Sequence, residues 1–123
     1  PFVLSGVVKH GQALGRTIGF PTANIDIADD TKLIPGNGVY AVFVSIDNQL
    51  FKGMLNIGVR PTVGKSTSRS IEVNIFDFDR DIYQQFITIQ FIRKIREEQA
   101  FESVENLRQQ LQEDEKAVRA VLA

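Results

Sequence analysis

Five short runs of β-branched and aromatic residues, separated by glycine, proline, asparagine and aspartate, most limit how this chain can fold. They cover residues 2–10, 38–46, 50–58, 70–78 and 86–92. In the last run Ile87, Ile89 and Phe91 share one face, as expected for a half-buried strand. Residues 47–49 are short enough to join the second and third runs in a hairpin. The chain is therefore predicted to be mainly β.

A helix is predicted after Ser103, which is a favourable N-cap residue. Apolar residues recur there at helical spacing: Val104, Leu107, Leu111, Val118 and Leu122. Glu105 lies in the first turn, where the helix dipole favours a negative charge. Because the run 38–46 is apolar on both faces, we expect this helix to cover its outer side. Short strands with a closing helix indicate a small antiparallel barrel with one helix packed on it.

Composition limits the class of protein further. A length of 123 residues fits one domain, 1–123. The formal net charge of −1 gives no general attraction to phosphate backbones or anionic lipid, so neither a nucleic acid nor a membrane is expected as a partner. No apolar run is long enough to span a bilayer, no signal-peptide pattern is visible, and cysteine is absent. A cytoplasmic location is therefore expected.

A glycine-rich segment, 6–19, precedes the sequence Pro-Thr-Ala-Asn at 21–24. Glycines such as Gly11 and Gly15 let backbone amides approach a phosphate closely. The spacing is not that of a Walker A loop, whose lysine is missing, and Pro21 disfavours the helix that should follow such a loop. A wide turn at the entry to the barrel explains the same glycines equally well.

Thr22 and Asn24 offer two neutral oxygens on the same side of an extended backbone. Mg²⁺ is commonly shared between a few such protein oxygens and nucleotide phosphates, so two neutral ligands suffice if ATP supplies the charge. The alternative is that both side chains simply hydrogen-bond a turn after Pro21, and these residues alone favour it.

Glu72 is the acidic residue best placed for catalysis. Ile71, Val73 and Ile75 occupy one face of its run, and Glu72 lies on the other. A carboxylate on a stiff strand is well placed to accept a hydroxyl proton, although most strand glutamates only face water.

Other charged residues allow two interpretations each. Three aspartates could form a metal cluster or, as we favour, a solvated turn between strands: Asp77, Asp79 and Asp81. Four cations could meet phosphate or the edge of a ring: Arg60, Arg93, Lys94 and Arg96. For Arg96 a structural ion pair with Glu97 and Glu98 is slightly favoured. Phe101 is expected to be a core residue under the helix, and His10 lacks the partners of a zinc site.

Taken together, the segments resemble the riboflavin kinase family, specifically the C-terminal kinase module of bacterial bifunctional FAD synthetases. The resemblance covers nearly the whole chain and rests, in order, on GVVKHGQALGRTIGFPTANI, PGNGVYAV, NIGVRPTVG, IEVNIFDFDRDIY and FIRKIREEQAFESVENLRQQLQEDE. It implies a six-stranded antiparallel Greek-key barrel with a C-terminal helix. It also implies transfer of the γ-phosphoryl group of ATP to the ribityl 5′-hydroxyl of riboflavin, which gives FMN and ADP.

By the same resemblance, Thr22 and Asn24 hold Mg²⁺ beside the phosphates, and Glu72 is the catalytic base. The ATP phosphates are covered by a flap, to which the resemblance assigns Gly11, Gly15, Arg16 and Pro21. The isoalloxazine ring is bordered by the segment that contains Arg96, Glu98 and Phe101. We expect the metal pair and the base to meet at one mouth of the barrel.

Two residues depart from the family pattern. Asn74 stands where the family often has histidine, and Gln84 stands where glycine is usual, which leaves substrate contacts and one turn open. The resemblance also implies an N-terminal FMN adenylyltransferase module in the native protein; without it, these 123 residues are expected to make FMN and not FAD. A barrel that binds flavin or nucleotide without catalysis is the alternative.

Overall fold

The computed structural model describes residues 2–9, 19–26, 34–61, 67–78 and 80–123. Gly11, Gly15 and Arg16 of the expected flap, with His10 and Asp79, lie outside these ranges. The described strands are β1 (Phe2–Lys9), β2 (Ala23–Asp26), β3 (Gly38–Ile46), β4 (Gln49–Pro61), β5 (Thr67–Ile75) and β6 (Phe86–Arg96). The helix α2 (Val104–Leu122) follows them.

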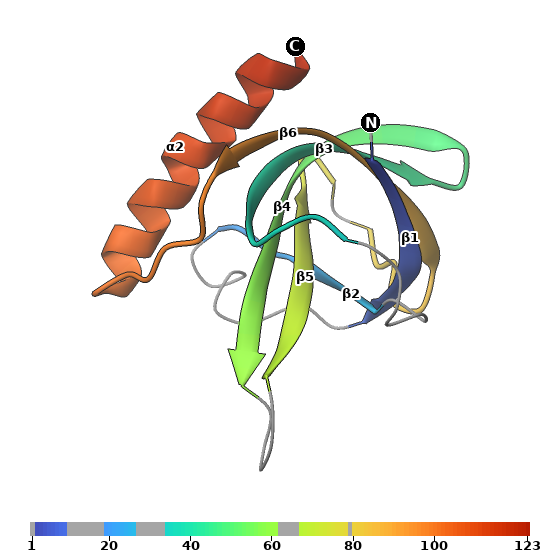
Figure 1. Ribbon diagram of the computed structural model, residues 1–123. Coiled ribbons are helices and arrows are strands. Elements are labelled where there is room, and N and C mark those ends of the chain that lie inside the picture. The colour runs from blue at the N-terminus through green and yellow to red at the C-terminus, as the bar shows by residue number, and fades with distance from the viewer. Residues whose placement is uncertain (1, 10–18, 27–33, 62–66, 79) are drawn as a thin grey trace.

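The strands close into a barrel in the order β1-β2-β5-β4-β3-β6, and every neighbouring pair is antiparallel. Strands β3, β4 and β5 follow one another, and β6 then returns to lie beside β3, which is a Greek key (Figure 1). Each of the six described strands therefore has a hydrogen-bonded neighbour on both sides. The predicted mainly β barrel with a C-terminal helix is confirmed.

The hairpin between β3 and β4 has a two-residue turn, because Ile46 pairs directly with Gln49. Asp47 and Asn48 both have positive φ, 51° and 66°. Such a turn has the twist that antiparallel strands need, and Asp and Asn tolerate it better than most residues. The predicted hairpin is therefore present, one residue tighter than residues 47–49 suggested.

Apolar side chains at alternate positions of the strands fill the barrel interior. Ile87, Ile89 and Phe91 of β6 are all buried there, as their alternation predicted. Ile71, Val73 and Ile75 of β5 face the same interior. Because inward and outward positions alternate, the residues between them on β5 face outward.

Helix α2 packs against the outside of the barrel, over β3, β4 and β6 (Figure 1). Ser103 is its N-cap, and the Ser103 hydroxyl accepts a hydrogen bond of 3.1 Å from the backbone N–H of Asn106. A second apolar cluster forms between helix and barrel; its buried members are Phe20, Ala41, Met54, Phe76, Val118 and Leu122. Ala41 of β3 packs in this cluster with the helix residues, so the expectation that the helix covers the outer side of β3 is confirmed. No helix in the described ranges is long and apolar enough to cross a membrane.

Candidate active site

A cavity of about 290 Å³ lies between the outer face of β4 and β5 and the segment that joins β6 to α2. Its floor consists of three cross-strand pairs, every second pair of the β4–β5 ladder: Met54–Asn74, Asn56–Glu72 and Gly58–Ser70. Directly paired residues of an antiparallel ladder point to the same face, so all six share the floor. The floor therefore changes from apolar at Met54 to polar at Glu72 and Ser70.

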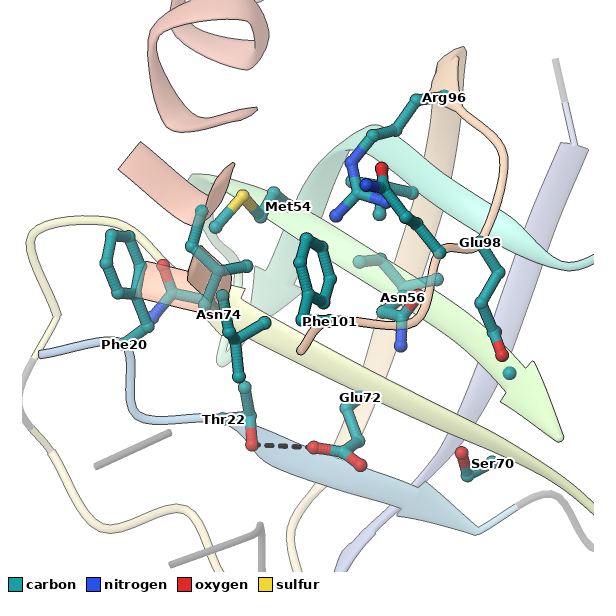
Figure 2. A pocket seen from close by; sticks show the side chains of 16 residues that line it. Phe20, Thr22, Met54, Asn56, Ser70, Glu72, Asn74, Arg96, Glu98 and Phe101 are labelled. Atoms are coloured by element: carbon teal, nitrogen blue, oxygen red, sulfur yellow. Dashed lines mark hydrogen bonds between the residues drawn. The ribbon is translucent and has the colours of Figure 1, made fainter. Parts of the chain in front are cut away.

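Glu72 is held on both sides by backbone pairing and is only 9% exposed. The Thr22 hydroxyl donates a hydrogen bond of 2.9 Å to Glu72 Oε1 (Figure 2). Asn24 is the cross-strand partner of Glu72 in the β2–β5 ladder, so its side chain lies on the same outer face. The structure brings Thr22, Asn24 and Glu72 together. They face outward from the barrel wall, and not into its mouth, because the interior is occupied by the core.

Asn74 connects the pocket floor to the segment before β2. Its Nδ2 donates a hydrogen bond of 2.7 Å to the carbonyl oxygen of Pro21. Pro21 itself is exposed and precedes Thr22. The departure at position 74 thus has a structural role, since the amide ties the Pro-Thr-Ala-Asn segment to β5.

The expected ion pair of Arg96 with Glu97 and Glu98 is wrong. The guanidinium instead pairs with Asp114 of α2: Nε lies 2.9 and 3.1 Å from the two carboxylate oxygens, and Nη2 lies 2.8 Å from Oδ2. Glu97 pairs with Lys94 and gives Arg96 only its backbone carbonyl, at 3.0 Å from Nη1. The Asp114 carboxylate on the helix accepts hydrogen bonds from both Nε and Nη2 of the planar guanidinium. The side chain of the adjacent Glu97 points to Lys94 instead.

Sequence reasoning missed Asp114, although a signal was present. The apolar stripe of α2 runs through Leu107, Leu111, Val118 and Leu122. Position 114 continues this stripe at helical spacing, so an acidic residue there is directed toward the barrel and needs a buried partner. Asp114 is 2% exposed, and Arg96 is that partner.

Phe101 and Glu98 border the cavity from the segment before α2 (Figure 2). Phe101 is half-buried and belongs to neither apolar cluster, so its expected place in the core is wrong. Its ring lies 5.7 Å from Arg96 Cζ. The Glu98 carboxylate rests over Gly58, and the absence of a side chain at position 58 leaves room for this close approach.

Of the three aspartates after β5, Asp77 and Asp81 are described, and both are exposed, with Asp77 in a turn as favoured. Asp77 has φ of 56°, and Asp81 Oδ1 accepts a hydrogen bond of 3.0 Å from the Tyr83 backbone. Within the described ranges, no three His, Cys, Asp or Glu side chains are close enough to form a metal site of their own. The Arg60 side chain lies outside what the structure describes, and Arg93 and Lys94 do not line the cavity.

The donor set beside Glu72 suits a hard cation. Thr22, Asn24 and Glu72 supply hydroxyl, amide and carboxylate oxygens, whereas the thioether of Met54 lies on the next pair of the cavity floor. Mg²⁺ prefers such oxygen ligands and completes its shell with phosphates and water. The site residues present therefore fit a magnesium ion that is shared with a nucleotide.

The site combines an outward carboxylate with neutral oxygens and faces a cavity with an aromatic wall, an arrangement that phosphoryl transfer can use. The sequence model of the flavokinase family, described as riboflavin kinase, matches residues 1–122, and the chain belongs to this riboflavin kinase family. The resemblance predicted from the sequence is confirmed.

Two relatives whose names include riboflavin kinase agree with this assignment, and one solved structure with a different title shares the fold. The chain is 44% identical to the RNA-binding riboflavin kinase RibR of Bacillus subtilis, over 91% of this chain and 47% of that protein. It is also 44% identical to the bifunctional riboflavin kinase/FMN adenylyltransferase of Pseudomonas fluorescens, over 100% of this chain and 39% of that protein. A solved structure titled as a macrolide-efflux protein from Streptococcus pneumoniae superposes with a TM-score of 0.88 at 40% identity, over 97% of this chain and 38% of that one. The chain spans less than half the length of these relatives.

Proposed function

We propose that this chain phosphorylates riboflavin at the ribityl 5′-hydroxyl, with ATP as donor, to give FMN and ADP. Family membership supports the substrate class. The observation that carries the proposed mechanism is the contact of 2.9 Å between Thr22 and Glu72 on the cavity floor, with Asn24 directly opposite Glu72. This arrangement supports the assignment of Glu72 as proton acceptor and of the neighbouring neutral oxygens as metal ligands.

In this mechanism Glu72 orients the 5′-hydroxyl and accepts its proton as the hydroxyl oxygen bonds to the γ-phosphorus. The bond between the γ-phosphorus and the bridging oxygen breaks, and ADP leaves. When bound, Mg²⁺ neutralises phosphate charge, and we assign its protein ligands to Thr22 and Asn24. Phosphoryl transfer needs mainly positioning and charge neutralisation, which a rigid ladder on both sides of Glu72 supports.

The flavin ring is assigned to the wall that Arg96, Glu98 and Phe101 form. Phe101 offers an aromatic face, and Met54 makes the nearby floor apolar, as a flat ring requires. The flap over the phosphates is assigned, from the resemblance alone, to Gly11, Gly15, Arg16 and Pro21. We also propose an N-terminal FMN adenylyltransferase module in the native protein, as in the bifunctional relatives, and a cytoplasmic location, where ATP is available.

The test is an HPLC assay of riboflavin incubated with the chain, ATP and Mg²⁺. We expect FMN and ADP in equal amounts, loss of both with EDTA, and recovery when Mg²⁺ is restored. Saturable quenching of flavin fluorescence with no consumption of ATP would instead identify a non-catalytic binding barrel. Absence of both quenching and product would reject the proposed function.

A further inference from the structure

Four polar or charged side chains are buried in the described part of the chain: Ser70, Glu72, Asn74 and Asp114. The first three line the cavity, and Asp114 does not. Its carboxylate reaches the site only through Arg96, which does line the cavity. A buried carboxylate is costly unless it is paired. Asp114 nevertheless stands where an apolar residue would continue the stripe of α2, so its pairing with Arg96 calls for an explanation.

Arg96 joins three parts of the protein. It ends β6, its Nη1 donates to the carbonyl oxygen of Glu97, and its Cζ lies 5.7 Å from the Phe101 ring. Asp114 fixes this guanidinium from the helix side with contacts of 2.8 to 3.1 Å. Gln110 also donates to Asp114 Oδ1, at 2.9 Å, and so restricts the carboxylate.

The segment 97–103 between β6 and α2 has no strand or helix pairing of its own. The contacts that hold it include those of Arg96, the approach of Glu98 to Gly58 and the cap at Ser103. Segment 97–103 is joined to β6 at one end and to α2 at the other. A rigid link between β6 and α2 therefore fixes the positions of both ends and limits the path of the segment. The Arg96–Asp114 pair is such a link, with both partners largely withdrawn from water at 18% and 2% exposure.

We propose that Asp114 is a positioning residue for the wall of the cavity assigned to the flavin ring. It acts through Arg96, and it holds Glu98 and Phe101 at the distance from β4 that the ring requires. This inference rests on the proposed function for the identity of the ring. The part that concerns segment 97–103 can be tested without any ligand.

The test variant is Asp114→Asn, which keeps the size of the side chain and removes its charge. The matched control is Asp77→Asn. Asp77 also pairs with a helix arginine, Arg119, at 3.4 Å, but it is 82% exposed and does not line the cavity. Asparagine also tolerates the positive φ of Asp77. Both variants therefore remove one ion pair between helix and barrel, and only one of these pairs touches the cavity.

In Asp114→Asn we expect faster hydrogen–deuterium exchange of 97–103 in the ligand-free protein and a riboflavin KM raised about tenfold or more. The KM for ATP should stay near the wild-type value, because Thr22 and Asn24 lie beside Glu72 and not on segment 97–103. Asp77→Asn should change none of these quantities. Unchanged exchange and unchanged riboflavin KM in Asp114→Asn would overturn the inference, as would an equal rise of both KM values.

If Asp114→Asn fails to fold, Arg96→Lys is the variant that tests the inference. Lysine keeps a positive charge opposite Asp114 but cannot form the fork or reach Glu97 at the same time. Faster exchange of 97–103 in the ligand-free variant supports the inference, and wild-type exchange overturns it. A wild-type chain that neither binds nor phosphorylates riboflavin would refute the proposed function while leaving the exchange result valid.

Discussion

Glu72 owes its position to pairing on both sides. Its backbone is fixed by Asn24 on one neighbouring strand and by Asn56 on the other, and its side chain is fixed by Thr22. A group held in this way needs no reorganisation when a hydroxyl arrives. The same geometry makes a conservative substitution at this position informative.

We expect Glu72→Gln to lower kcat for FMN formation by a factor on the order of a hundred or more, because the amide cannot accept the hydroxyl proton. The amide oxygen can still accept the hydrogen bond from Thr22, so the fold and flavin affinity should be retained. Steady-state kinetics and flavin fluorescence quenching measure these effects. A variant with wild-type kcat would remove Glu72 as the base.

Gln84 shows what a departure from the family pattern costs. It has φ of 67°, within a turn closed by a hydrogen bond of 2.9 Å from Gln85 N to Ile82 O. Gln84 N also donates to Val8 O at 2.8 Å, which ties the turn to β1. A positive φ at the third position of a turn is the conformation that favours glycine.

Replacing Gln84 with glycine should therefore stabilise the protein by roughly 0.5 to 1 kcal/mol, since relief of left-handed strain exceeds the added entropy of the unfolded chain. Thermal denaturation measures the change as a higher Tm. Gln84→Ala serves as the control, because it shortens the side chain without relieving the strain. A lower Tm for Gln84→Gly would contradict this account.

Single residues were predictable where their neighbours in sequence decide their environment. Alternation placed Glu72 and Thr22 each on one face of an extended segment, but the resemblance selected them as candidate site residues. The partner of Arg96 was not found, since Asp114 lies 18 positions away and meets it only after the helix docks. Their closeness in sequence favoured Glu97 and Glu98 as the ion-pair partners of Arg96, and this criterion ignores what the docked helix supplies.

At the scale of elements, the cap of α2 matters for the site as well as for the helix. Leu107 and Leu111, in the first half of α2, line the cavity. Ser103 fixes where the helix begins, and segment 97–103 ends there. The helix start therefore also sets the end of the wall that contains Phe101.

Ser103→Ala should reduce the free energy of unfolding by about 1 kcal/mol, because the backbone N–H of Asn106 loses its acceptor. Urea denaturation followed by circular dichroism measures this value. Ser103→Asp is the control, since aspartate is an equally good cap and should retain the stability. Equal losses in both variants would show that the hydroxyl does more than cap the helix.

The sequence predicted some strands clearly and others not at all. The run 86–92 was clear because a two-residue period extends over seven positions. Strand β2 has only four residues and contains alanine, asparagine and aspartate, which are poor strand formers. It is a strand because β1 and β5 pair with it on both sides, and such pairing cannot be read from local composition. The resemblance, not periodicity, supplied the count of six.

At the scale of the whole molecule, the barrel provides the floor of the cavity, and the helix with its preceding segment provides one wall. The order of the strands was not predictable from periodicity alone, because contacts such as β3 with β6 join residues some fifty positions apart. A ligand that touches both floor and wall should stabilise the whole arrangement.

We expect riboflavin with ADP and Mg²⁺, each near 100 times its Kd, to add about 2.7 kcal/mol or more to the free energy of unfolding. For a domain of this size, that corresponds to a rise in Tm of roughly 10 °C. Differential scanning calorimetry measures the shift. Glu72→Gln should show the same rise, because binding does not require proton transfer; no rise with either protein would argue against binding at this site.

The core and the pocket floor use opposite faces of the same two strands. Leu55, Ile57 and Val73 point into the barrel, while Asn56, Glu72 and Ser70 point out of it. The polar residues of the floor can therefore be exchanged without opening a void in the barrel core, because the two sets of side chains alternate along the same strands. Met54 is different, since it belongs to both the floor and the second apolar cluster, and its replacement would change the fit of a ligand and the packing of the helix together.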